Sequence, residues 1–356
     1  MTASTPTHQD TAMATAWSAL ADQIRAFGEA ATRRGDPLDQ AEGLRHTLRY
    51  LGHLADCHLE HTDPLRPQFW RAITQTRKYY GDGVDVDYDT CRIDGRHTYR
   101  ITGTPGTVPY LAFIVNRKGV GNRFAGNIVI GEEHLRADGT FEIWLAAHIG
   151  KRPGLEIDDQ CVEVVARQYH NDRAGEVPAE FTIERVGAAL PPREPLDTSA
   201  VTASLRRIGY SLDVTLKRLD GLVEAISREL NVVKNSSGSA GAEFFGTTSN
   251  QYQVGWWDLD EDEVLEMTFA PADARYFGVQ LFNRWFESLE FRDHVTSLNN
   301  SQITAEPSGE MVVHIGKSDG PVNRLDPCGH RSGIILVRYL EGATNPSEPR
   351  VRVVKR

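Results

Sequence analysis

The chain has 356 residues, of which 40% are hydrophobic and 25% charged, and its net charge is −10 at pH 7. This length predicts two domains with a helical appendage. No apolar run approaches the roughly 18 residues that cross a membrane, and the acidic balance argues against nucleic acid or an anionic membrane as partner. We therefore expect a small neutral or apolar molecule as ligand or substrate, and no cofactor.

The four cysteines lie far apart and form no Cys-x-x-Cys pair. This spacing argues against a zinc ribbon or a redox motif. Reduced cysteines favour a cytoplasmic protein, and the absence of any basic residue before Arg25 argues against a secretory signal.

Two amphipathic helices are predicted in the first 80 residues. Residues 12–34 and about 38–60 carry apolar side chains at three- and four-residue steps, and residues 35–37 separate the two runs. The first stripe contains Trp17, Leu20, Ile24, Phe27 and Ala31, and the second contains Ala41, Leu44, Leu48, Leu51 and Leu54. We expect the two helices to pair as a hairpin, followed by a short helix over residues 67–78.

The second predicted helix places His53, Cys57 and His61 at four-residue steps along one side. Two imidazoles and a thiolate on one helix face can bind zinc. The alternative is a histidine-rich, partly exposed face beside the leucine stripe. We expect no metal here, because no fourth ligand is apparent nearby.

Asp82, Asp85 and Asp87 lie in a glycine-rich loop, where alternating carboxylates are candidates for calcium. The EF-hand pattern fails, because Thr90 and Arg96 occupy the positions of its glycine and its bidentate glutamate. The alternative is a solvated turn before a strand.

The first β-sandwich is predicted over residues 81–190. Six strand-like runs recur there between turn residues, at 98–102, 109–115, 127–130, 141–145, 161–169 and 179–185. The glycine-spaced basic stretch 116–123 interrupts them and does not follow the dinucleotide fingerprint, so we predict a mobile loop.

A linker and central helices are predicted over residues 191–240. A stiff proline-rich linker spans 191–195, and an apolar stripe then runs through residues 201–233, where Gly209 and Gly221 are possible breaks. This stripe needs a partner surface, which is either the N-terminal helices or the same helix in a homodimer. A flexible joint follows at about residues 235–241.

The last predicted domain, residues 241–356, is a second sandwich of jelly-roll type. Its strands are expected at 277–282, 296–303, 311–315 and 334–340. Alternation over 296–303 places Asn300 and Gln302 on one face and Asn299 on the other, and buried amides either brace a fold or line a polar pocket. We therefore predict substrate contacts from these three amides and from Asn283, Trp285, Arg324 and Tyr88.

Many residues of this last domain also occur, at corresponding positions, in a mostly bacterial family of unknown function, family 1214. They are Asn283, Trp285, Glu287, Ser288, Leu289, Arg292, Thr296, Leu298, Asn299, Gln302, Gly320, Asn323, Leu325, Asp326, Gly329, His330, Gly333 and Arg338. Upstream, Lys78, Gly81, Asp82, Asp85 and Tyr88 match more weakly. The chain thus resembles that family, which implies a fold but no reaction. Arg324 replaces a tryptophan of the family and is expected to alter a pocket wall.

Four residues near the end of the chain are candidates for chemistry. Asp326 and His330 lie four residues apart in a glycine- and proline-containing loop, where a carboxylate can orient an imidazole as general base. Glu287 lies beside aromatic residues that can raise its pKa, and Arg292 can stabilise an anion. The alternative is structural, with Glu287 and Arg292 as an ion pair and Asp326 capping its turn.

The sequence therefore predicts a mainly β protein with helical segments and two β-sandwiches. The leading functional hypothesis is a cofactor-independent hydrolase or lyase, acting on a small organic molecule in a cleft between the sandwiches. The alternative is a non-catalytic binding protein for a carbohydrate or another small ligand, or an assembly protein, because sandwich folds serve all of these purposes.

Overall fold

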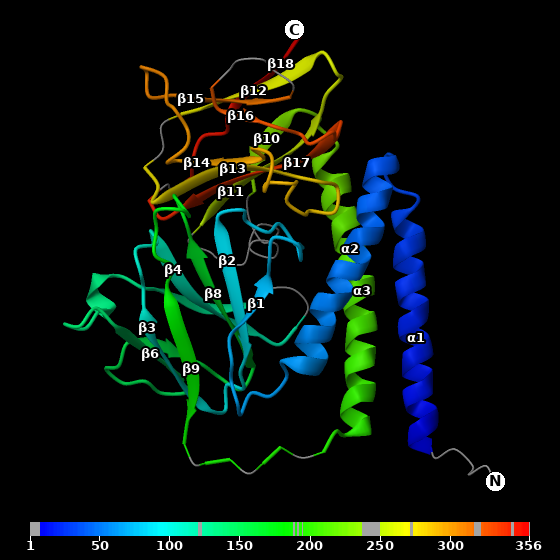
Figure 1. Ribbon diagram of the computed structural model, residues 1–356, viewed down its shortest axis with the longest axis vertical. Helices are drawn as coiled ribbons and strands as arrows, with labels where there is room; N and C mark the ends of the chain where they lie inside the picture. The colour runs from blue at the N-terminus through cyan, green and yellow to red at the C-terminus, as the bar shows by residue number, and fades with distance from the viewer. Residues whose placement is uncertain are drawn as a thin grey trace.

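Three α-helices lie along one side of two β-sandwiches in the computed structural model (Figure 1). The structure describes residues 8–119, 123–187, 189–190, 192–193, 195–236, 250–270, 273–316, 322–342 and 345–355. Gly320, residues 191 and 194 of the linker, most of the predicted joint after Asn235 and the centre of the 116–123 loop lie outside these ranges. The mainly β fold with helical segments and two β domains is as predicted.

The helices are α1 (His8–Ala31), α2 (Pro37–Ala55) and α3 (Thr198–Ile226). Asp36 starts α2, because its side chain accepts a hydrogen bond from the backbone N–H of Asp39. Asp197 caps α3 in the same way, and α3 continues through Gly209 and Gly221 without a break. It packs against α1 and α2 of the same chain, so the intramolecular partner surface predicted for the central stripe exists. No helix among the described residues is long and apolar enough to cross a membrane.

The buried face of α2 differs from the predicted leucine stripe. Leu44 and Leu48 are 44% and 67% exposed, whereas Glu42, His46 and Tyr50 are buried. Buried polar groups are stable only with hydrogen-bonding partners, and the second sandwich supplies them, as described below. The hydrogen bonds of this polar interface, and not the spacing of the leucines, therefore decide which face of α2 is buried.

The first sandwich consists of two antiparallel-rich sheets. One has the order β1 (Trp70–Ile73), β2 (Val86–Arg92), β8 (Cys161–Tyr169), β4 (Tyr110–Arg117), β5 (Arg123–Val129), and the other has β7 (Gly154–Glu156), β6 (Phe141–Ala146), β3 (Thr98–Thr104), β9 (Glu180–Val186). Phe113 and Phe141 from the facing sheets meet in its core.

The short helix predicted over 67–78 is wrong, because β1 forms there and pairs with β2. A 3-10 turn lies at Glu132–His134.

The second sandwich follows the same plan. One sheet has the order β10 (Val232–Asn235), β11 (Gln251–Asp258), β17 (Ser332–Leu340), β13 (Tyr276–Phe282), β14 (Ser297–Asn299), and the other has β16 (Arg324–Leu325), β15 (Met311–Ile315), β12 (Glu263–Phe269), β18 (Arg350–Lys355). β14 ends at Asn299, so the strand predicted over 296–303 is too long and Asn300 and Gln302 lie in a turn.

The two faces of strand β17 pack into two different hydrophobic cores. Ile335 and Val337 enter the core of the second sandwich, whereas Ile334 and Leu336 pack into the cluster that contains the helices. Successive side chains of a strand point to opposite faces, so Arg338 shares the second face with Leu336. This places a guanidinium where the helices and both sandwiches meet.

Candidate functional site

A polar wall is formed by the outer face of the first sandwich. In β8, Val164 and Ala166 enter the sandwich core, and the alternate residues Glu163, Arg167 and Tyr169 therefore face away from it. In the neighbouring β2, Cys91 is in the core and Tyr88, Thr90 and Arg92 face outward in the same way. Two paired strands thus present charged and aromatic side chains side by side.

This wall lines a cavity of about 630 Å³. The end of α2 and α3 form further walls, and Tyr252 and Arg338 contribute from the second sandwich. Arg92, Lys118 and Arg207 line the cavity and are also exposed, so the cavity opens to solvent between the first sandwich and α3. A volume of this size suits a small organic molecule.

The cavity lining is basic and aromatic, in a chain that is acidic overall. Its only carboxylate among the described residues is that of Glu163, against six basic side chains: Arg92, Lys118, Arg167, Arg207, Arg218 and Arg338. Seven of the eleven tyrosines of the chain line it, namely Tyr50, Tyr79, Tyr80, Tyr88, Tyr169, Tyr210 and Tyr252. The local field therefore attracts anions although the whole protein repels them.

Arg338 is the most deeply buried of these cations, with 4% of its surface exposed. It donates hydrogen bonds from Nη2 to the carbonyl of Gly81 (2.5 Å) and from Nη1 to Oε1 of Gln280 (3.1 Å). Both acceptors are neutral, and no carboxylate of the described residues lies within ion-pair distance. Because a guanidinium carries five N–H groups, Arg338 has donors left for a ligand.

The last turn of α2 brings His53 to the cavity and the residues just after α2 bring Cys57, with Nε2 of His53 3.4 Å from the sulfur. Burial lowers the pKa of His53 to about 3, with help from the positive charge of Arg77. Burial also raises the pKa of the Cys57 thiol. At neutral pH the pair is therefore a neutral imidazole and a thiol, neither of which is activated for chemistry.

The zinc interpretation of His53, Cys57 and His61 is wrong in its geometry. The chain leaves α2 as a π-helix, Asp56–Glu60, which shifts the helical phase, and His61 stacks on the ring of Trp70 at 4.6 Å. Within the described ranges, these three do not bring their ligand atoms together.

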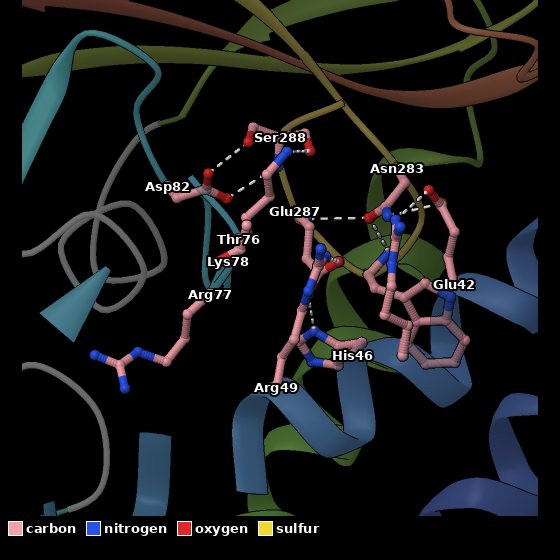
Figure 2. A network of polar contacts seen from close by, with 12 residues as sticks. Glu42, His46, Arg49, Thr76, Arg77, Lys78, Asp82, Asn283, Glu287 and Ser288 are labelled. Carbon is pink, nitrogen blue, oxygen red and sulfur yellow. Dashed lines mark hydrogen bonds and ion pairs between the residues drawn. The ribbon is translucent and has the colours of Figure 1, made fainter. Parts of the chain in front are cut away.

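Glu287 is completely buried and forms an interdomain ion pair (Figure 2). Its Oε1 accepts a hydrogen bond from Nδ1 of His46 and its Oε2 one from Nη1 of Arg49, each at 2.9 Å. Both partners belong to α2, so the carboxylate fastens this helix to the second sandwich. The predicted pairing of Glu287 with Arg292 is wrong, since Arg292 pairs with Glu290 at the surface.

A second polar link joins His330 to Glu42 of α2. The imidazole donates from Nε2 to Oε2 of Glu42 (2.9 Å) and from Nδ1 to the carbonyl of Pro327 (2.9 Å), and Nδ2 of Asn283 donates to the same Glu42 oxygen (2.7 Å). Burial alone would lower the pKa of His330, but the bond to Glu42 raises it. Burial alone would raise the pKa of Glu42, but the bond to His330 lowers it.

Asp326 does not orient His330, contrary to the sequence prediction. Its Oδ2 accepts a hydrogen bond from Nδ1 of His294 (3.0 Å), and its Oδ1 caps the backbone N–H of Cys328. The turn-capping alternative for Asp326 is therefore correct.

The remaining predicted contacts are also made to protein. The indole of Trp285 donates to the carbonyl of Asp39, Asn299 donates to Asp85 and to the carbonyl of Asn171, and Arg324 donates to the carbonyl of Gly316. Asn300 and Gln302 accept hydrogen bonds from the backbone of Phe277 and Asn299, respectively.

Within the described residues, the three aspartates considered for calcium, Asp82 and Asp85 before β2 and Asp87 within it, do not form a cluster of metal ligands. Asp82 accepts two hydrogen bonds from Ser288, Asp85 accepts one from Tyr276, and Asp87 pairs with Arg173. Figure 2 shows the link between Asp82 and Ser288, beside which Nζ of Lys78 donates to the carbonyl of Ser288 at 2.9 Å. Asp82 and Asp85 thus connect the two sandwiches, whereas Asp87 is bound within the first one. The solvated turn is also a wrong prediction for Asp82, which is buried.

Of the residues predicted for catalysis or substrate contact, Tyr88 alone is among the described residues that line the cavity. Sequence reasoning missed Arg338, Arg167 and Tyr169 as site residues. A usable signal was present, because a lone arginine in the apolar strand Ser332–Leu340 must find a partner or a cavity. The pairing of that strand face with the helices, however, is a property of the tertiary fold.

No family model and no curated protein matches the chain, so the resemblance to family 1214 stays a prediction. A crystal structure of an uncharacterized protein from Burkholderia cenocepacia is similar to it, with a TM-score of 0.92, 30% identity, and coverage of 97% of this chain and 98% of the other. A Vibrio parahaemolyticus protein shares the fold alone, with a TM-score of 0.50, 12% identity and coverage of 94% and 99%. The chain belongs to the same family as the uncharacterized protein from Burkholderia cenocepacia.

Proposed function

We propose that the protein binds a small organic anion with an aromatic or other planar portion in the cavity between the two sandwiches and α3. The observation that carries this proposal is Arg338, a buried guanidinium in the cavity wall whose hydrogen bonds go only to neutral groups. A ligand carboxylate or phosphate would supply the missing negative charge.

The physical reason is the cost of a buried charge that has no direct ion-pair partner among the described residues. Removing a guanidinium from water is unfavourable unless an anion or several hydrogen bonds replace its hydration, and arginine binds carboxylate or phosphate through two parallel N–H groups. The tyrosines around it offer flat apolar faces together with hydroxyl donors. At the open side, Arg92 and Arg207 would attract the anion before it enters.

Binding is favoured over turnover by the state of the reactive groups at the cavity. Burial raises the pKa of the Cys57 thiol and lowers the pKa values of His53 and His58 to about 3 and about 4. A thiol and two weakly basic imidazoles make a poor nucleophile and poor general bases at neutral pH. The hydrolase or lyase hypothesis relied on Glu287, Asp326 and His330, whose side chains bind other protein groups and do not line the cavity. We therefore propose the binding alternative, with an anion in place of a carbohydrate.

The experiment compares anionic probes with their neutral analogues. Aryl carboxylates and aryl phosphates are screened beside the corresponding amides and alcohols by thermal shift, and the best anion is then titrated calorimetrically. We expect the anions to raise the melting temperature of the protein and the neutral analogues to leave it unchanged. Arg338→Met should weaken binding by roughly tenfold to a hundredfold, the value of a charged hydrogen bond.

Arg331→Met is the matched control, because Arg331 lies immediately before the same strand, with its side chain 68% exposed and outside the cavity lining. It should bind as the wild type does. Arg338 also binds the carbonyl of Gly81, so its replacement can disturb the fold. Arg207→Met is therefore a second cavity variant, at an exposed position, and it too should weaken binding of the anion. Equal stabilisation by anions and neutral analogues, or unchanged binding in both cavity variants, would refute the proposal.

A further inference from the structure

Three possible metal ligands meet near the surface of the second sandwich, away from the cavity. His294 lies in the segment between β13 and β14, and Asp326 and Cys328 lie in the loop between β16 and β17. One imidazole nitrogen, one carboxylate oxygen and the sulfur all lie within 4.8 Å of one another. Within the described part of the chain, this is the one place where three such side chains converge.

Backbone contacts hold the two loops together at this point. The N–H of Asp326 donates to the carbonyl of Val295 at 2.7 Å, which places His294 beside the other loop. The N–H of Cys328 donates to Oδ1 of Asp326 at 2.8 Å. Cys328 has a φ of 52°, a conformation that few non-glycine residues adopt, so its side chain is directed by a tight turn. The arrangement is thus fixed by backbone hydrogen bonds before any ligand arrives.

We propose that His294, Asp326 and Cys328 form a binding site for a divalent transition-metal ion of the zinc class. Nitrogen, oxygen and sulfur together form a donor set that zinc accepts, whereas calcium and magnesium take oxygen ligands. This site is independent of the anion-binding cavity.

The spacing agrees with this chemistry. Nδ1 of His294 and Oδ2 of Asp326 are 3.0 Å apart, and two ligands of one tetrahedral zinc ion are separated by about 3.3 Å. The side chains of His294 and Asp326 are 44% and 35% exposed, so an ion can reach them from solvent. Three protein ligands leave a fourth position for water or another donor.

The test uses the full-length protein, freed of metal with a chelator and then titrated with zinc by calorimetry. Cobalt(II) replaces zinc in a parallel titration, because cobalt bound to a thiolate gives a charge-transfer absorption in the near ultraviolet. We expect one ion per chain and this absorption. His294→Ala and Cys328→Ser should each weaken zinc binding by roughly tenfold or more, since even outer-shell changes at metal sites have that effect.

His148→Ala is the matched control for a surface histidine beside a carboxylate, because Nδ1 of His148 lies 3.1 Å from Glu156 without a cysteine. Cys57→Ser controls for the other thiol close to an imidazole. Both controls should keep the affinity and the absorption. The proposal is overturned if zinc does not bind, if the absorption survives Cys328→Ser, or if either control loses as much affinity as the His294 variant.

Discussion

The buried carboxylate of Glu287 leads to a quantitative prediction for Glu287→Gln. The substitution keeps the size of the side chain but removes its charge, and it replaces an acceptor by an amide donor that faces either His46 or Arg49. Both wild-type contacts are 2.9 Å and Glu287 is fully buried, so solvent cannot replace them. Removing one partner of a buried pair lowers the free energy of unfolding by about 3–5 kcal/mol, and we expect a loss in this range.

Urea unfolding followed by tryptophan fluorescence and by circular dichroism measures this loss. The two probes should give coincident transitions, because the variant free energies are comparable only for a cooperative unfolding. Glu290→Gln is the matched control in the same loop, since Glu290 pairs with Arg292 at the surface, and it should change the stability little. A Glu287→Gln variant as stable as the Glu290→Gln variant would refute the view that this ion pair fastens α2 to the second sandwich.

Two further predictions concern helix α2 and its interface with the second sandwich. The free energy of unfolding should fall as the pH rises through the raised pKa of His330, because the contribution of its imidazolium is complete only below its usual pKa of 6.5. The lowered pKa of Glu42 acts at the acidic end. The stability that its carboxylate contributes is complete above the usual pKa of 4.5 and is lost as the pH falls through the lowered pKa. In urea unfolding at a series of pH values, the difference between wild type and His330→Gln should narrow toward alkaline pH; a constant difference would contradict this assignment. Gly43→Ala should destabilise the protein by about 1–3 kcal/mol, because the added Cβ would lie 2.4 Å from the ring of Trp285. Gly52→Ala, where nothing lies within 4 Å, should raise the stability by about 0.5–1 kcal/mol, and the opposite order of melting temperatures would contradict the packing described for α2.

Several strands of the two sandwiches could be predicted because their cores require strict alternation. β3, β4, β6 and β8 all overlap the predicted runs, since each has one face in a hydrophobic core and turn residues at its ends. The N-terminal and central helices were likewise evident from their apolar period. The strand β1 was missed because four residues are too few to show a period.

The site could be predicted only in part, because its partners are distant in the sequence. Glu287 and His330 were identified as unusual, but their partners Glu42 and His46 lie on a helix whose leucine pattern predicted the opposite buried face. Arg338 could be identified as an exception within an apolar strand, whereas the neutrality of its partners depends on which loop packs beside it. The alternation of side chains along a strand predicts on which face of the sheet a residue lies. Only the tertiary fold determines which other element packs against that face.

The inward polar face of α2 has a consequence for how the molecule can be divided. Asn283 and Glu287 receive their partners from positions 241 residues earlier in the chain. A fragment cut before β10 would contain every strand of the second sandwich yet expose a carboxylate, an amide and the ring of Trp285 that the whole protein covers. The strand architecture therefore does not mark an autonomous unit, and truncation or domain exchange should carry α2 along with the C-terminal strands.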